Sequence, residues 1–148
     1  MDATDRQIVQ SMLKDARRPL AQIADEIGVA TSTVHQRVKR LEESGVVRGS
    51  RVIVDWTALG YPVLAILSAE VGSGGLADAA ETFRSIPGVQ SCWAITGEFD
   101  LMLVVRARSS AHLGEIIEQL RDATPIHTRT TIVLNTYFEG RFPPLDDV

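Results

Sequence analysis

The 148-residue sequence contains a single cysteine, Cys92, which excludes an intrachain disulfide and a cysteine-based metal cluster. Aromatic residues make up only 5% of the chain. No apolar run approaches the roughly 20 residues of a membrane-spanning helix. The first ten residues carry acids where a secretory signal needs basic and then apolar residues, so we expect a cytoplasmic protein without a membrane segment.

Metal and redox chemistry are not expected either. His112 and His127 lie apart in the sequence, and no acid-rich cluster accompanies them, so the pattern does not indicate a metal site. Cys92 lies in the middle of a predicted strand, where a small buried hydrophobic side chain is a commoner role than a redox sensor. We expect no cofactor.

The net charge of −4 is unevenly distributed along the chain. Residues 1–55 contain nine basic and eight acidic side chains, whereas the remainder contains six and eleven. The acidity therefore belongs to the second half. A local positive surface near the N-terminus is compatible with an acidic protein that binds nucleic acid.

Two short helical patterns meet across Gly28 within residues 20–43. The apolar positions of the first are Leu20, Ile23, Ala24 and Ile27. Those of the second are Val34, Val38 and Leu41. Because glycine readily ends a helix in the left-handed conformation, this arrangement predicts a helix-turn-helix. Thr31 and Ser32 are candidate N-caps of the second helix.

The other face of this second helix offers hydroxyl, amide and cationic groups, and no acid lies between Thr31 and Leu41. Such groups suit base edges and phosphates in the major groove of DNA. The candidate DNA-binding residues of this helix are Thr31, Ser32, Thr33, His35, Gln36, Arg37, Lys39 and Arg40. An ordinary solvated helix face is the alternative interpretation.

The residues on either side of the helix-turn-helix complete this domain. Upstream, an apolar stripe predicts another helix, with Thr4 or Asp5 as its N-cap. Downstream, β-branched runs within Val46–Val54 flank a Gly-Ser pair and predict a β-hairpin with a type II′ turn. Arg48 and Arg51 beside that turn are further candidates for DNA contact if the hairpin acts as a wing, although it could be only an arm leading out of the domain.

The second half alternates strand and helix patterns in the order β-α-β-β-α-β, which is a ferredoxin-like arrangement. The predicted strands cover residues 63–71, 89–95, 101–107 and 128–138, and helical patterns cover 76–83 and 113–120. The fold class is therefore α+β, a (winged) helix-turn-helix domain followed by a ferredoxin-like domain. The expected boundaries are 1–54 for the first domain, 55–62 for a hinge, 63–138 for the second domain and 139–148 for a tail.

Two helices can cover only one face of such a sheet, yet its strands are apolar at both parities. Leu64 and Ile66 alternate with Ala65 and Leu67, for example. A second copy of the sheet is the simplest cover for the other face, so we expect a homodimer through this domain.

Several motifs resemble the leucine-responsive/asparagine-regulator (Lrp/AsnC) family of transcription regulators, and the resemblance covers nearly the whole chain. In the first half it rests on Asp5–Ile8, Leu20–Ala24 with Gly28, and Gln36–Val47. In the second half it rests on Gly88-Val89, Cys92, Thr96–Leu101 and Arg129–Leu134. The phrase RVKRLEESGVV followed by the turn GEFD is the most specific part.

The resemblance implies that the first domain binds operator DNA and the second binds a small effector, usually an amino acid. It further implies dimers that commonly assemble into octamers. The positions that match the family's effector-response residues are Gly97, Glu98, Phe99 and Asp100 of the turn and Thr131, Ile132 and Val133 of the last strand. An acid in this turn suits an ammonium group, and backbone N–H groups suit a carboxylate.

Other interpretations use the same residues. Gly97 and Asp100 are also typical of an ordinary tight turn with a solvated Glu98. An architectural, nucleoid-associated protein would bind DNA through the same helix with little sequence preference. Siroheme decarboxylases resemble this family, but the retention of Gln36, Lys39 and Arg40 on the helix favours a regulator over an enzyme.

Overall fold

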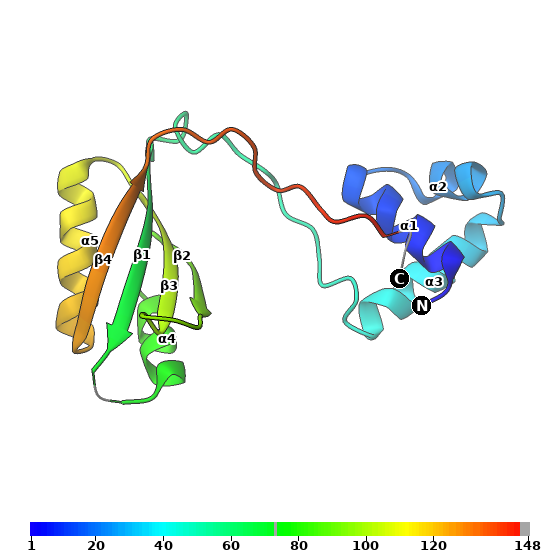
Figure 1. Cartoon of the computed structure of the whole chain (residues 1–148). Helices are drawn as coiled ribbons and strands as arrows, with labels where there is room; N and C mark the ends of the chain where they lie inside the picture. The colour runs from blue at the N-terminus through cyan, green and yellow to red at the C-terminus, as the bar shows by residue number, and fades with distance from the viewer. Residues whose placement is uncertain (73, 146–148) are drawn as a thin grey trace. The chain divides into compact units, whose positions relative to one another are not determined.

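The computed structural model describes residues 1–72 and 74–145 (Figure 1). The chain divides into two compact units. The first contains Met1–Ile53, and the described residues from Phe138 onward group with it. The second contains Val54–Tyr137. Among the described helices, none has both the length and the apolar character needed to cross a membrane.

The described residues of the first unit form three helices, α1 (Ala3–Lys14), α2 (Leu20–Ile27) and α3 (Thr31–Glu43). Gly28 ends α2 with φ of 78°, in the left-handed region that side chains with a Cβ rarely adopt. The apolar faces of the helices meet in one core, formed by Ile8, Ile23, Ala24, Val34, Val38 and Leu41. The helix-turn-helix is therefore confirmed.

The helix caps differ from the sequence-based expectation. Asp2 is the N-cap of α1 and forms a reciprocal capping box with Asp5, so neither Thr4 nor Asp5 is the cap. The N-cap of α3 is Ala30, which makes no side-chain capping hydrogen bond. Thr31 already lies inside the first turn, and an N-cap must keep an extended backbone.

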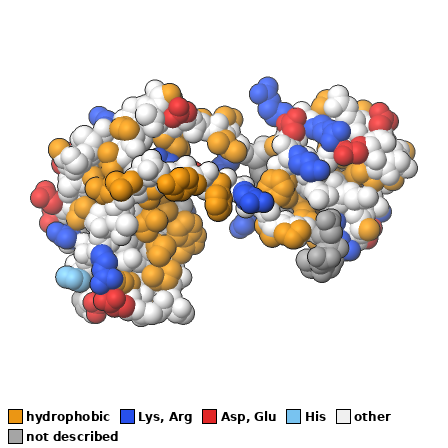
Figure 2. All heavy atoms as spheres, turned by 45° about the horizontal axis from the view of Figure 1, so that its top comes forward, with side chains coloured by type: hydrophobic (Ala, Val, Ile, Leu, Met, Phe, Trp, Pro, Cys, Tyr) orange, Lys and Arg blue, Asp and Glu red, His pale blue; other side chains and the backbone are white. Residues whose placement is uncertain are grey.

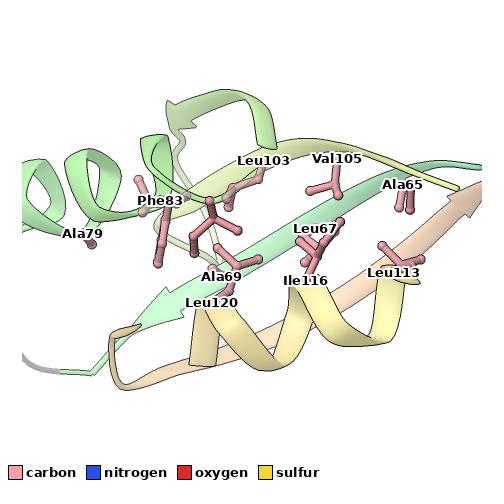
Figure 3. Packing of buried hydrophobic residues seen from close by; sticks show 13 residues of the cluster. Ala65, Leu67, Ala69, Ala79, Phe83, Leu103, Val105, Leu113, Ile116 and Leu120 are labelled. Carbon is pink, nitrogen blue, oxygen red and sulfur yellow. The ribbon is translucent and has the colours of Figure 1, made fainter. Parts of the chain in front are cut away.

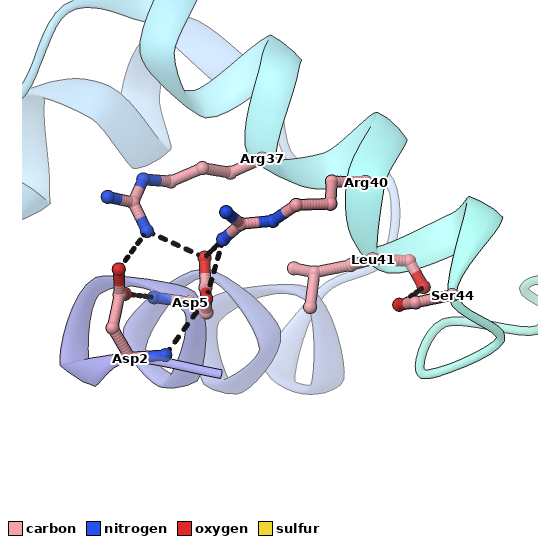
Figure 4. Close-up of polar contacts among 6 residues, drawn as sticks. All are labelled: Asp2, Asp5, Arg37, Arg40, Leu41 and Ser44. Carbon is pink, nitrogen blue, oxygen red and sulfur yellow. Dashed lines mark hydrogen bonds and ion pairs between the residues drawn. The ribbon is translucent and has the colours of Figure 1, made fainter.

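An ionic cluster joins α1 to α3 (Figure 4). The Asp5 side chain is only 1% exposed, and its carboxylate accepts hydrogen bonds from Arg37 Nη1 at 2.7 Å and Arg40 Nη2 at 2.8 Å. Arg37 Nη1 also pairs with Asp2. A buried carboxylate is costly unless its charge and lone pairs are satisfied, so these arginines make the buried position of Asp5 tolerable.

The predicted β-hairpin is absent from the structure. Residues Val46–Val54 contain no strand, and Val52 and Ile53 are 84% and 95% exposed. An isolated two-stranded hairpin is marginal in water, and these β-branched side chains find no apolar surface within the unit to pack against. Arg48 and Arg51 accordingly lie on an extended segment and not on a wing.

The second unit has the predicted element order. Its strands are β1 (Val63–Val71), β2 (Val89–Ala94), β3 (Leu101–Ala107) and β4 (Ile126–Val133), and its helices are α4 (Leu76–Arg84) and α5 (Ser110–Ala123). The strand order is β2-β3-β1-β4, with every neighbouring pair antiparallel. The ferredoxin-like α+β fold is therefore confirmed.

Strand β4 begins two residues earlier and ends five residues earlier than the sequence pattern predicted. In the register with β1, Val133 lies opposite Leu64, close to the start of β1. Residues beyond Val133 would have to pair with the segment at Pro62, which has no backbone N–H to donate. Leu134 is accordingly 88% exposed, despite its strand-like sequence context.

Helices α4 and α5 pack against one face of the sheet and bury its core (Figure 3). Leu67 of β1 and Val105 of β3 are fully buried there with Phe83 of α4 and Leu120 of α5. This face consists of alternate strand residues, because successive side chains of a strand point to opposite sides of a sheet. The helices thereby fix which residues remain on the other face.

We call that other side of the sheet the open face, and it carries apolar side chains beside the polar Ser68 and Arg106. Leu64 and Ile66 of β1 and Met102 and Val104 of β3 are each only half-buried. Trp93 of β2 is 51% exposed. Figure 2 shows hydrophobic side chains gathered on the surface of this unit. The two alternating sets of apolar strand residues therefore lie on different faces of the sheet, one covered by the helices and one open.

Because of the ionic cluster, we expect the stability of the first unit to fall at acidic pH. Hydrogen bonding from Arg37 lowers the pKa of Asp2 from 3.8 to about 2. Burial raises the pKa of Asp5, but hydrogen bonds from the Asp2 backbone and Arg37 and the charge of Arg40 outweigh it, so that pKa is lowered as well. The unfolded state then binds protons more tightly, so the cluster's contribution to stability is complete above roughly pH 5 and is lost progressively as the pH falls toward 2.

This loss is measured by thermal melts, in which the circular dichroism signal of the helices is followed at a series of pH values. The series runs from about pH 5 to about pH 2, so that it brackets the ordinary pKa of Asp. Asp2→Asn should flatten the fall in melting temperature, because the amide does not titrate. Asp25→Asn removes an exposed acid of α2 and is the matched control. An identical pH dependence in wild type and Asp2→Asn would contradict the role given to the cluster.

Candidate functional site

The outer surface of α3 presents a row of polar side chains to solvent. Ser32, His35, Gln36 and Lys39 are all exposed, while Thr33 is half-buried. Lys39 is 70% exposed, and its only ion pair in the described structure is a long 3.8 Å contact with Glu43. These side chains are therefore free to donate to or accept from an external partner, as the helical spacing predicted.

Arg37 and Arg40 are placed differently from the rest of the candidate DNA-binding residues. Both reach back from α3 to the N-terminus of α1 (Figure 4). The Arg37 side chain is 25% exposed, whereas that of Arg40 is 61% exposed. A helical projection of α3 alone could not show this, because the acids that bind the two arginines come from α1.

A second polar site lies where the β2–β3 turn meets β4. Glu98 Oε1 accepts a hydrogen bond from Arg129 Nη2 at 3.1 Å, and the Arg129 guanidinium lies over the Phe99 ring, 4.8 Å from its centroid. Both charged side chains are largely exposed, at 70% and 62%. We call Glu98, Phe99 and Arg129 the turn site.

The remaining turn residues shape this site. The Asp100 carboxylate accepts a hydrogen bond from the Val71 N–H at 2.9 Å, and the Asp100 N–H donates to the Ala69 carbonyl at 3.0 Å. Asp100 thus fastens the turn to the end of β1. Gly97 has φ of 119°, which explains why glycine stands there.

The three candidate positions of β4 do not share one face of the sheet. Thr131 lies opposite Ile66 and Val133 opposite Leu64, which places both on the open face. Ile132 lies opposite the buried Ala65 and therefore points to the helix-covered side, where it is 49% exposed. Only Thr131 and Val133 share the face that carries Arg129.

Arg129 is the site residue that sequence reasoning missed. It lies opposite Ser68 of β1, which in turn lies opposite Met102 of β3, so the row continues across the open face. The sequence offered one signal for it. Arg129 lies two residues before Thr131 in the same strand, so the two side chains are on the same face of the sheet. An exposed Glu98 carboxylate and an exposed Arg129 guanidinium together match the ammonium and carboxylate groups of a zwitterion.

Neither site resembles a metal centre or a nucleophilic catalytic site. Within residues 1–72 and 74–145 no group of three or more His, Cys, Asp or Glu side chains is arranged to hold a metal ion. Burial raises the pKa of the Cys92 thiol, which keeps it in the poorly nucleophilic protonated form.

Comparisons with known proteins match both units. Residues 1–42 match the model of the AsnC-type helix-turn-helix domain, and residues 64–142 match that of the Lrp/AsnC ligand binding domain. The chain is 34% identical over 146 residues to the HTH-type transcriptional regulator FL11 of Pyrococcus abyssi, covering 98% of this chain and 97% of that protein. It is also 34% identical to the HTH-type transcriptional regulator LrpA of Mycobacterium tuberculosis, covering 95% of each chain.

Solved structures agree with these sequence matches. One is a feast or famine regulatory protein from M. tuberculosis complexed with L-methionine, with a TM-score of 0.92, 31% identity and coverage of 96% of this chain and 97% of that one. Another is AsnC of E. coli, with a TM-score of 0.88, 27% identity and coverage of 97% and 99%. The chain belongs to the Lrp/AsnC family of transcription regulators.

Proposed function

We propose that this protein binds operator DNA through α3 and that a small effector, an amino acid, changes the affinity of that binding. The observation that carries the proposal is the exposed polar row of α3, which ends a helix-turn-helix and contains no acid before Glu42. Gln36 suits bidentate hydrogen bonding to an adenine edge, and Lys39 suits a phosphate. The two residues therefore have separable roles in specificity and affinity.

The turn site is the proposed effector site. Arg129 provides donors for the effector's carboxylate, and Glu98 accepts from its ammonium group. In the free protein the two side chains neutralise each other at 3.1 Å, and the effector would replace that single ion pair with two. The relative that was crystallised with L-methionine supports an amino acid as the ligand class.

A second copy of the chain is the cover we propose for the open face. Leu64 and Ile66 of β1 and Met102 and Val104 of β3 give it apolar surface, which Trp93 extends onto β2. Ser68 and Arg106 lie on the same face. Burying this face removes apolar area from water. Arg129 of the turn site lies on the same face, in one row with Ser68 and Met102, so the site would adjoin the boundary between subunits.

This placement provides a mechanism for regulation. An effector bound beside a subunit boundary can favour one arrangement of the subunits over another, and each arrangement sets the spacing between two copies of α3. Because half-site spacing on DNA is fixed by the helical repeat, a changed spacing changes operator affinity. The effector needs only a differential affinity for the two arrangements.

The DNA interface is tested with a duplex that wild-type protein selects from a random-sequence pool, compared with a scrambled duplex. Gln36→Ala should weaken binding to the selected duplex by about 1–3 kcal/mol and leave binding to the scrambled duplex nearly unchanged. Lys39→Ala should weaken both and lower the salt slope by about one. Both are measured by fluorescence anisotropy over a range of salt concentrations.

Equal losses on both duplexes for Gln36→Ala would show that Gln36 does not read bases. Wild-type protein that binds scrambled DNA as tightly as the selected duplex would contradict a sequence-specific regulator and indicate an architectural DNA-binding protein.

The effector site is tested by thermal shift with a panel of the standard amino acids. A ligand at a hundred times its Kd should stabilise the protein by about 2.7 kcal/mol, and Arg129→Gln should abolish that shift. Arg84→Gln is the matched control, because Arg84 is also exposed and ion-paired, with Glu81 at 2.9 Å on α4. Sedimentation of the same samples measures assembly.

A shift that survives Arg129→Gln would place the effector elsewhere. A chain that sediments as a 16.2 kDa monomer would contradict the second copy as the cover of the open face.

A further inference from the structure

The two arginines of the ionic cluster between α1 and α3 differ in their contacts and in their exposure to solvent. Asp5 receives one hydrogen bond from Arg37 Nη1 and two from Arg40 Nη2, at 2.7, 2.8 and 2.8 Å. Its second carboxylate oxygen also accepts the backbone N–H of Asp2 at 2.9 Å. The carboxylate of Asp5 is therefore saturated and fixed in place.

The charge of Arg37 is paired within this cluster. Its Nη1 contacts both Asp2 and Asp5, and three-quarters of its side chain is buried. Its charge balances acids inside the unit, so it contributes little to an external partner.

Arg40 is held by the cluster but still available. Only its Nη2 contacts Asp5, and its side chain is 61% exposed. In the described part of the chain, Nε and Nη1 of Arg40 have no hydrogen-bond partner. Because the guanidinium is a rigid planar fork, fixing Nη2 against Asp5 also fixes the direction of its remaining N–H groups.

We propose that Asp5 is a positioning residue for DNA binding, which holds Arg40 so that its remaining N–H groups donate to a phosphodiester of the duplex. This inference rests on the proposed DNA-binding function and adds a residue of α1 to it. Arg40 lies four residues after Gln36, so it shares the side of α3 on which a base-reading residue is proposed. A guanidinium held in one orientation loses less side-chain entropy when it binds a phosphate.

For removal of the Asp5 charge, the proposal predicts a change in DNA affinity opposite in sign to the change that net charge alone predicts. Asp5 is an acid close to the DNA-facing helix, so removing its charge should strengthen binding to polyanionic DNA if only net charge mattered. If Asp5 positions Arg40, removing the charge should weaken binding instead. The two accounts therefore predict opposite changes in affinity.

The experiment compares Asp5→Asn with Asp25→Asn in the full chain. Asp25 is an exposed acid of α2 whose side chain has no hydrogen bond or ion pair in the described structure, so it provides the same charge change without a contact to Arg40. Affinity is measured on the duplex selected by the wild type, below the melting temperature of each variant. We expect Asp5→Asn to bind roughly threefold to tenfold more weakly, within the range of couplings between contacting residues, and Asp25→Asn to bind no more weakly than wild type.

A double-mutant cycle with Arg40→Gln separates positioning from general stability. Arg37 still pairs with Asp5 in Arg40→Gln, so the buried carboxylate keeps a cation. If Asp5 acts through Arg40, adding Asp5→Asn to Arg40→Gln should cause no further loss of affinity. A structural role would lower affinity by the same factor in both backgrounds.

Tighter or unchanged binding by Asp5→Asn would overturn the inference alone, and so would an equal loss in the Arg40→Gln background. Wild-type protein that binds neither duplex would overturn the proposed DNA-binding function, and the inference with it.

Discussion

A four-stranded sheet has two faces, and α4 and α5 are enough to cover one of them. The alternation of strand residues places Leu67 and Val105 under the helices and leaves Ile66 and Val104 on the open face. Exposed apolar surface gathered on one face marks an interaction site. This constraint connects the fold to the proposed function, because Arg129 of the proposed effector site lies on the same face.

The first unit meets a different constraint, since a small three-helix domain has little core with which to hold a DNA-binding helix in place. Six buried apolar residues form that core. The carboxylate of Asp5 adds a polar connection between α1 and α3, and its burial is tolerated because two guanidinium groups and a backbone N–H satisfy it. The charge that supports the fold is therefore the same charge that restrains the arginines of α3.

Sequence reasoning predicted the elements that short-range patterns determine. Gly28, the apolar positions of α3 and the alternation in β1 and β3 each depend on local periodicity, and the structure has them where the patterns indicated. Sequence reasoning failed where contacts between distant segments determine the local structure. Val52 and Ile53 are typical strand residues but remain almost fully exposed, and β4 ends where its partner strand begins. Contacts across elements, such as those of Arg40 with Asp5 and Arg129 with Glu98, left no signal in a single segment.

The central claim is that the effector and DNA act on one equilibrium. The most direct test is to measure the Kd of the amino acid that stabilises the protein, by calorimetry, with and without saturating amounts of the selected duplex. Thermodynamic linkage requires DNA to change the effector's Kd by the same factor by which the effector changes the Kd for DNA, typically about fivefold or more. An effector that binds at the turn site with the same Kd in the presence and absence of DNA would contradict the account.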